Sequence, residues 1–268
     1  MLLSIRHETV YRYTAPLTYT IQQLRLSPRV EPHQQVRSWE LCTAGRRNEF
    51  LDAFGNIGHM LTITGLHDEV RILAHGTVAV DPLDRGRLGG SSALSPLVFT
   101  VPTRLTEADE NIVEFAMLHR PGGVHSSGLL RLAEAIRDAV AYRKGATEVT
   151  TPATDALRLG QGVCQDHAHL FLSCCHVYGV PARYVSGYID PGETEHAASH
   201  AWVDVWVDES DFSGWVSIDV THARFASDAY CRLAIGRDYD SAAPVRGVRH
   251  GGGTESLSVH VDVSPIAS

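Results

Sequence analysis

Three short segments organise this chain, and in order they read Gly-Val-Cys-Gln-Asp-His-Ala (residues 162–168), Ser-His-Ala-Trp (199–202) and Gly-Trp-Val-Ser-Ile-Asp (214–219). They supply a thiol at Cys164, an imidazole at His200 and a carboxylate at Asp219. Such groups act together when a histidine takes the proton of the thiol and a carboxylate orients the imidazole. The local pattern of each segment indicates whether the fold can bring them together.

The first segment predicts the start of a buried helix. A Gly-Gln-Gly loop at residues 160–162 precedes it, and from Cys164 onward apolar side chains recur with helical spacing at Ala168, Phe171, Leu172 and Cys175. The backbone N–H groups of a first helical turn are unpaired, and the helix dipole is positive there. A thiol at Cys164 is therefore expected to have a lowered pKa and to be nucleophilic near neutral pH.

The second and third segments predict a β-hairpin. Residues 200–207 and 215–219 each alternate in the manner of a strand, and a polar turn lies between them. A hairpin closed at this turn pairs His200 directly with Asp219. Because side chains alternate with a period of two, both would lie on one face as cross-strand neighbours.

This order of thiol, imidazole and carboxylate, on a helix start and two successive strands, resembles the transglutaminase-like core of the papain-like thiol enzymes. Nearly the whole chain is similar to bacterial transglutaminase-like proteins that are named as cysteine proteases. The motifs that carry the similarity are Phe-Gly-Asn (54–56), Gly-Val-Cys-Gln-Asp (162–166), Ala-Arg-Tyr-Val-Ser-Gly-Tyr (182–188), His-Ala-Trp (200–202) and Gly-Arg-Asp-Tyr (236–239). The resemblance implies a catalytic triad of Cys164, His200 and Asp219.

One departure from the family pattern lies next to the expected carboxylate. The family usually has Asp-Pro-Thr after the last of these strands, whereas residues 219–221 read Asp-Val-Thr. The chain thus keeps the carboxylate and loses the proline that would make the turn rigid.

Composition excludes some classes of protein. The chain has 268 residues, of which 44% are hydrophobic and 20% charged, which is ordinary for a globular protein. The formal charge of −8 argues against a nucleic-acid partner, which would need a clustered basic surface. Five unevenly spaced cysteines without a Cys-x-x-Cys pair favour reduced thiols. Since no stretch approaches the ~20 apolar residues of a membrane span, we expect a cytoplasmic protein with no membrane partner.

Short alternating strands separated by turns occupy the chain up to about residue 80, and residues 81–102 are rich in Gly and Pro. Helical periodicity follows, and then the strands of the expected hairpin. We therefore predict an α+β fold: an N-terminal β-sandwich-like domain at residues 1–88, then a catalytic core at residues 89–268 with helices packed on an antiparallel sheet.

No cofactor or metal is predicted. His167 and His169 are two residues apart on the expected helix and so point to different sides. No set of Cys and His has the spacing of a structural zinc site, and no calcium-binding loop of the Asp-x-Asp-x-Asp-Gly kind is present.

The predicted chemistry is acyl transfer at amide bonds through a thioester on Cys164, with His200 as base and Asp219 as its orienting group. Hydrolysis of a peptide or isopeptide by a cysteine protease or amidase is the first interpretation. A protein-glutamine transglutaminase or deamidase is the alternative, since only the acceptor of the acyl group differs. A non-catalytic binding module is a further alternative. The expected partner is a peptide or protein substrate, and the oligomeric state does not follow from the sequence.

Overall fold

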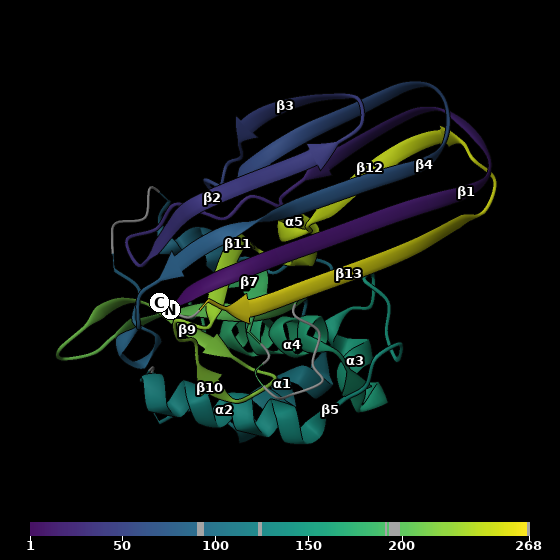
Figure 1. The fold of residues 1–268 in the computed structure, drawn as a ribbon. Helices are drawn as coiled ribbons and strands as arrows, with labels where there is room; N and C mark the ends of the chain where they lie inside the picture. The colour runs from purple at the N-terminus through teal and green to yellow at the C-terminus, as the bar shows by residue number, and fades with distance from the viewer. Residues whose placement is uncertain (90–93, 123–124, 191, 193–198, 267–268) are drawn as a thin grey trace.

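In the computed structural model, which describes residues 1–89, 94–122, 125–190, 192 and 199–266, the strands form a six-stranded sheet, a five-stranded sheet and a two-stranded pair (Figure 1). The larger sheet lies on one side of the molecule and the main helices on the other, with the five-stranded core sheet between them. This arrangement confirms the predicted α+β class.

Two long strands, β1 (Leu2–Leu24) and β4 (Ile57–Val80), run antiparallel through the larger sheet, and their register shifts between Arg12 and Leu17. One half of β4 pairs with β2 (Gln34–Thr43), and the other half pairs with β3 (Arg46–Leu51). Buried side chains from both halves belong to one hydrophobic core. The N-terminal region is thus one sheet of long shared strands, where the sequence predicted a sandwich-like domain of separate short strands.

The chain returns to this sheet at its other end. Strands β12 (Val245–Gly251) and β13 (Glu255–Pro265) both pair with β1. Figure 1 shows β13 beside β1, and Leu3 pairs with Pro265. Both strands lie after the predicted boundary at residue 88 and pair with β1, which lies before it. The division into residues 1–88 and 89–268 stays a prediction. Residues 257–263 of β13 alternate between apolar and polar side chains as a strand does, but most side chains of β12 and β13 are exposed, so the pattern does not indicate which strand they pair with.

The core sheet has the order β10-β9-β8-β7-β11. Its strands are β7 (Ala182–Ile189), β8 (Ser199–Asp208), β9 (Ser213–Asp219), β10 (Arg224–Phe225) and β11 (Tyr230–Gly236). The α-helices are α1 (Glu110–Leu118), α2 (Ser126–Ala139), α3 (Ala153–Leu159), α4 (Cys164–Val177) and α5 (Tyr239–Ala242). Short elements complete the fold: 3₁₀ turns η1 (Asp84–Gly86) and η2 (Pro96–Thr100), and the parallel pair β5 (Ala141–Tyr142) and β6 (Gln161–Gly162). No described helix has the length and apolar character that crossing a membrane requires.

Helix α4 packs on one face of the core sheet. Ala201, Val203 and Val205 of β8 share a buried cluster with the helix. Since strand side chains alternate, the intervening residues His200, Trp202 and Asp204 point to the opposite face. The sheet therefore has an apolar face toward α4 and a second face that carries its polar groups.

The hairpin of β8 and β9 forms as predicted, but in a different register. Asp204 pairs with Ser217, which shifts the pairing by two residues from the expected one, so the direct pairing of His200 with Asp219 is wrong. The turn closes one residue later, with Glu209 N donating to Phe212 O at 2.8 Å. A shift of two preserves the facing of each side chain, so His200 and Asp219 remain diagonal neighbours on one face.

Candidate active site

Cys164 is the first residue of α4, as the sequence predicts. The helix start is held by Asp166, whose Oδ2 accepts the backbone N–H of Val163 at 2.7 Å and the hydroxyl of Thr147 at 2.6 Å. Gly162 lies against this carboxylate, where a Cβ would come within 2.7 Å of Asp166 Oδ2. The thiol therefore sits on a fixed helix terminus and is partly accessible to solvent.

His200 lies between the thiol and the carboxylate. Its Nε2 donates to Asp219 Oδ2 at 2.9 Å, and both side chains are buried, at 4% and 0% exposed. The other ring nitrogen is left for Cys164, with which His200 forms a second hydrogen bond. The structure thus brings together the three side chains that the sequence singled out.

The charges of the neighbours set the protonation state of His200. Burial alone would lower its pKa, but the Asp219 carboxylate and the Cys164 sulfur outweigh burial and raise the pKa of His200 to about 10. Burial would raise the pKa of Asp219, yet His200 and His222 hold it well below its usual range. At neutral pH His200 is therefore an imidazolium, and it is paired with the Asp219 carboxylate.

Two further residues fix the Asp219 carboxylate, and sequence reasoning missed both. His222 Nδ1 and the hydroxyl of Tyr230 each lie 2.7 Å from Asp219 Oδ2. Arg224 Nε in turn donates to the Tyr230 hydroxyl at 2.9 Å. His222 follows Asp219 by three residues, so its spacing in the turn was a usable signal. The contact of Tyr230 with Asp219 depends on how β11 packs, and the local sequence gives no signal for that packing.

Aromatic rings cover the base on one side. The ring of Trp202 stacks on His200 with centroids 6.2 Å apart and planes 25° apart, and it meets Tyr230 edge-on at 5.3 Å. Trp202 is fully buried. The rings keep water from this side of the imidazole and so strengthen its ion pair with Asp219.

The turn after β9 is held although it lacks the proline of the family pattern. Thr221 Oγ1 lies 3.0 Å from His167 Nδ1, and the other nitrogen of that ring donates to Val140 O at 2.8 Å. His169 Nε2 instead accepts the backbone N–H of Tyr239 at 3.0 Å. Both helix histidines are therefore engaged in packing and do not converge on one centre.

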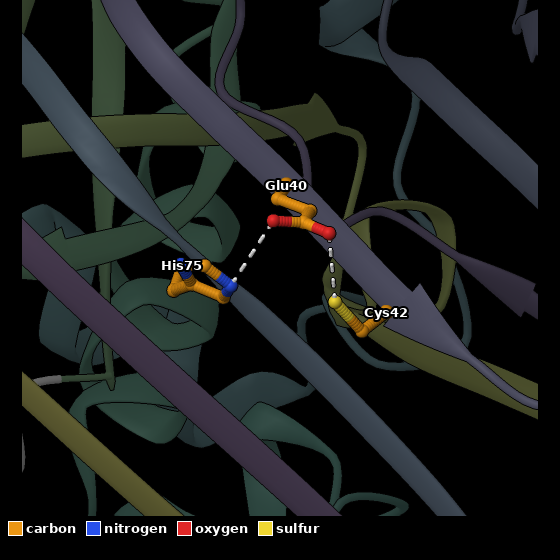
Figure 2. A group of neighbouring side chains, drawn as sticks. All are labelled: Glu40, Cys42 and His75. Atoms are coloured by element: carbon orange, nitrogen blue, oxygen red, sulfur yellow. Dashed lines mark hydrogen bonds and ion pairs between the residues drawn. The ribbon is translucent and has the colours of Figure 1, made fainter.

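Two groups within the described residues have three metal-ligating atoms within 4.8 Å of one another. One is His200, Asp219 and His222, whose donors already bond to each other. The second, Glu40, Cys42 and His75, lies on the larger sheet (Figure 2). There the Glu40 carboxylate accepts from Cys42 Sγ at 3.3 Å and lies 3.6 Å from His75 Nε2, and it is 68% exposed. These groups satisfy one another without an ion, so neither set gives a reason to assign a metal.

Comparison with known proteins is consistent with this architecture. Residues 120–220 match the model of the transglutaminase-like superfamily, and residues 3–79 match that of the bacterial transglutaminase-like N-terminal region. An uncharacterized protein of Mycobacterium leprae is 29% identical over 288 residues that cover 99% of each chain. An uncharacterized protein of Mycobacterium tuberculosis is 28% identical over 291 residues, which cover 97% of this chain and 92% of the relative.

Among solved structures, the fold is similar to that of a protein described as "a Putative Cysteine Protease from Cytophaga hutchinsonii". The TM-score is 0.77, with 21% identity over 100% of this chain and 91% of the other. At this identity the likeness establishes the fold alone.

Proposed function

From a chain that joins a bacterial transglutaminase-like N-terminal region to a transglutaminase-like core, we propose a cysteine hydrolase that cleaves peptide or isopeptide amide bonds. The observation that carries the proposal is the contact of three groups. Cys164 at a helix start bonds to His200, and His200 bonds to the fully buried Asp219. This is the relation of nucleophile, base and orienting carboxylate that covalent acyl transfer requires.

In the first half of the reaction, the Cys164 sulfur attacks the amide carbonyl and forms the carbon–sulfur bond of a tetrahedral intermediate. The backbone N–H of Cys164, at the first position of α4, donates to the oxyanion in this proposal, because the N–H groups of a first helical turn have no partner within the helix. His200 then gives its proton to the leaving nitrogen as the carbon–nitrogen bond breaks. The products are a free amine and a thioester on Cys164.

In the second half, His200 takes a proton from water as the water oxygen attacks the thioester. The carbon–sulfur bond then breaks and the carboxylic acid leaves, while the proton taken from water stays on His200 as the imidazolium beside the freed Cys164 sulfur. Asp219 keeps the same contact with Nε2 throughout and so holds the ring in one orientation. Attack by an amine in place of water would give transfer instead of hydrolysis.

The test is digestion of a peptide library derived from a proteome, followed by mass spectrometry of the new termini. We expect cleavage by the native protein and by Cys42→Ala, which removes a thiol on the other sheet, but no cleavage by Cys164→Ala. A parallel reaction contains a labelled primary amine. Amine incorporation with little cleavage would make the protein a transglutaminase, and no Cys164-dependent change in either reaction would contradict thiol catalysis.

A further inference from the structure

A cavity of about 540 Å³ lies where loops of the larger sheet meet the core sheet, apart from Cys164. Arg183 of β7 and Trp215 of β9 line it from the core sheet, and Arg29 and Glu31 line it from the connection between β1 and β2. Val30, which is 82% exposed, lies at its rim. The volume falls in the range of sites for small ligands, which is ~300–1,000 Å³.

A chain of buried ion pairs joins the two arginines that line the cavity. Arg29 Nε lies 2.8 Å from Glu31 Oε1, and Glu31 Oε2 lies 2.8 Å from Arg232 Nε. Arg232 Nη2 lies 2.6 Å from Asp204 Oδ2, which also accepts from Arg183 Nε at 2.7 Å. Cations and anions thus alternate, and a cation stands at each end of the chain.

This series of ion pairs contains one more positive charge than negative. Burial alone would raise the pKa of Asp204, but Arg232 and Arg183 hold it well below its usual range, so the carboxylate is charged. The carboxylate of Glu31 is likewise charged, since its pKa is lowered by Arg232 and Arg29 against the effect of burial. Three guanidinium groups therefore face two carboxylates.

A neighbouring carboxylate does not cancel the excess. Asp52 and Arg29 both hydrogen-bond to Asn56, and the Asp52 carboxylate has a cation of its own in Arg25 at 3.0 Å. An unbalanced charge in a buried setting is unfavourable unless a counter-ion accompanies it. The excess charge thus favours a bound monoanion.

Arg183 is the cation best placed to receive it. Its side chain is 7% exposed, and within the described residues only Nε has a protein acceptor. The guanidinium lies over Trp215, 4.2 Å from the ring centroid, and both residues line the cavity. Leu88, Trp215 and Ile235 make the surrounding wall apolar.

We propose that this cavity binds a carboxylate attached to an apolar group, with the carboxylate on Arg183 and the apolar group against Trp215 and Leu88. The planar guanidinium edge matches a carboxylate in two parallel hydrogen bonds. A single negative charge balances the excess, whereas a phosphate dianion would exceed it. The same chemistry is offered by the C-terminus of a peptide with an apolar last residue and by a free aryl or alkyl acid.

The cavity lies on the same face of the core sheet as the candidate base. Asp204 and His200 are four residues apart on β8, so their backbones are about 13 Å apart at ~3.3 Å per residue. The proposal concerns binding and does not depend on the thiol chemistry. Binding should therefore be the same in Cys164→Ala, whatever the outcome of the digestion test.

The experiment is isothermal titration of the full chain with phenylacetate and, as the neutral match, phenylacetamide. A ligand of this size supports a Kd of about 1 mM, and we expect the amide to bind at least ~10-fold more weakly because it leaves the excess charge unbalanced. Equal binding of the two, or no saturable binding of phenylacetate up to about 20 mM, would overturn the proposal.

Variants at the rim avoid disturbing the buried ion pairs. Val30→Glu places a negative charge at the mouth of the cavity, and Val30→Gln is its neutral match. We expect Val30→Glu to weaken phenylacetate about fivefold relative to Val30→Gln through charge repulsion across the mouth. Arg183→Met should abolish phenylacetate binding if the variant folds. If the variant does not fold, the comparison of Val30→Glu with Val30→Gln tests the proposal. Equal affinity in the rim pair would contradict the proposal.

Two peptide arms identify the source of the carboxylate. The peptide Gly-Gly-Gly-Phe is titrated with a free C-terminus and as its C-terminal amide. Binding of the free acid alone indicates a peptide terminus, while binding of phenylacetate without either peptide indicates a free organic acid. Binding of the amide as tightly as the acid would show that the carboxylate is not recognised.

Discussion

Asp219 is the residue on which the geometry of the site depends. Its Oδ2 is contacted by His200, His222 and Tyr230, at 2.9, 2.7 and 2.7 Å, and the side chain is fully buried. A carboxylate with three such contacts is fixed in position as well as charged. His200 is therefore held in one orientation by a group that cannot itself rotate.

We expect Asp219→Asn to reduce turnover by on the order of 10²–10⁴-fold while the fold, followed by circular dichroism, is retained. An asparagine has nearly the same shape but cannot stabilise the imidazolium, and its NH₂ group would oppose the ring N–H. Turnover is measured on the best peptide from the library digestion. Full turnover in Asp219→Asn, together with its loss in His200→Ala, would remove Asp219 from the proposed triad.

The matched variant Tyr230→Phe tests the same carboxylate from its other side. It removes one hydrogen bond to Asp219 and leaves the bond to His200, so we expect turnover to fall by less than about tenfold. A loss as large as that of Asp219→Asn would mean that the phenol acts in the chemistry itself.

The sequence identified Cys164, His200 and Asp219 because each lies in a segment with a clear local pattern. Tyr230 could not be found in the same way, and the one signal for His222 was its spacing of three residues from Asp219. Their contacts with Asp219 arise from the turn after β9 and from the placement of β11, and neither is encoded in a local period.

At the scale of single elements, the start of α4 was predictable because a glycine-rich loop and a helical period meet there. The register of the hairpin was not. Its turn is fixed by Glu209, whose carboxylate contacts Arg87 at 3.0 Å and the backbone N–H of Ser126 at 2.7 Å. Both partners are distant in sequence, so a local pattern could not set the turn to within one residue. His200 still lies on the predicted face of the sheet, because the predicted register was wrong by two residues and an even shift does not change which face a side chain is on.

Gly162→Ala should destabilise the start of α4. The added Cβ would lie 2.7 Å from Asp166 Oδ2 and 2.8 Å from Asp166 Cβ, so the carboxylate that holds the helix terminus has to move. We expect a loss of about 1–3 kcal/mol in the free energy of unfolding, measured by urea titration. Gly122→Ala, where an added Cβ meets nothing within 4 Å, is the control and should leave stability unchanged. Equal stability of both variants would show that Asp166 does not hold the helix terminus as described.

At the scale of the whole molecule, the two ends of the chain complete one sheet. The sequence indicated β strands before residue 80 and one near the C-terminus, but pairing between them spans more than 240 residues, as in Leu3 with Pro265. Contacts of that range leave no local signal. Tyr188, Cys231 and Leu233 of the core sheet also join the hydrophobic core of the larger sheet, so the two sheets are packed together.

A fragment of residues 1–88 should therefore fail to fold alone. It lacks β12 and β13, which pair with β1 along both of its halves, and it loses the contacts of Tyr188 and Leu233. We expect no cooperative urea transition by circular dichroism, in contrast to the full chain. A cooperative transition in the fragment would restore residues 1–88 as an independent domain.

Stability should fall on the acid side of neutrality. Burial lowers the pKa values of His7, His169 and His176 to about 4, whereas an unfolded histidine has a pKa of about 6.5. The unfolded state therefore binds more protons below pH ~6.5, and each histidine costs about 2 kcal/mol of stability by pH ~5. His200, with its pKa raised to about 10, acts in the opposite sense, but most of its contribution is already present at pH ~7.

His169→Gln isolates one of these contributions. A glutamine oxygen can still accept the backbone N–H of Tyr239, but it does not titrate. We expect the loss of unfolding free energy between pH ~7 and pH ~5, measured by urea titration, to shrink by about 2 kcal/mol in this variant. An unchanged loss would show that His169 is not buried in its neutral form.

The central claim is that Cys164 and His200 form an activated pair, and alkylation of Cys164 tests it without a known substrate. The other thiols are poor competitors: burial raises the pKa values of Cys174, Cys175 and Cys231, and a hydrogen bond to Glu40 raises that of Cys42.

Limiting iodoacetamide is added at pH ~6 and pH ~8, and the labelled peptides are mapped by mass spectrometry. We predict that Cys164 is modified first at both values, with a rate that changes little between them, and that His200→Ala lowers the rate at pH ~6 by at least tenfold. Faster labelling of another cysteine would contradict the account. So would a rate of Cys164 labelling that falls about tenfold for each unit by which the pH is lowered, in both the native protein and His200→Ala.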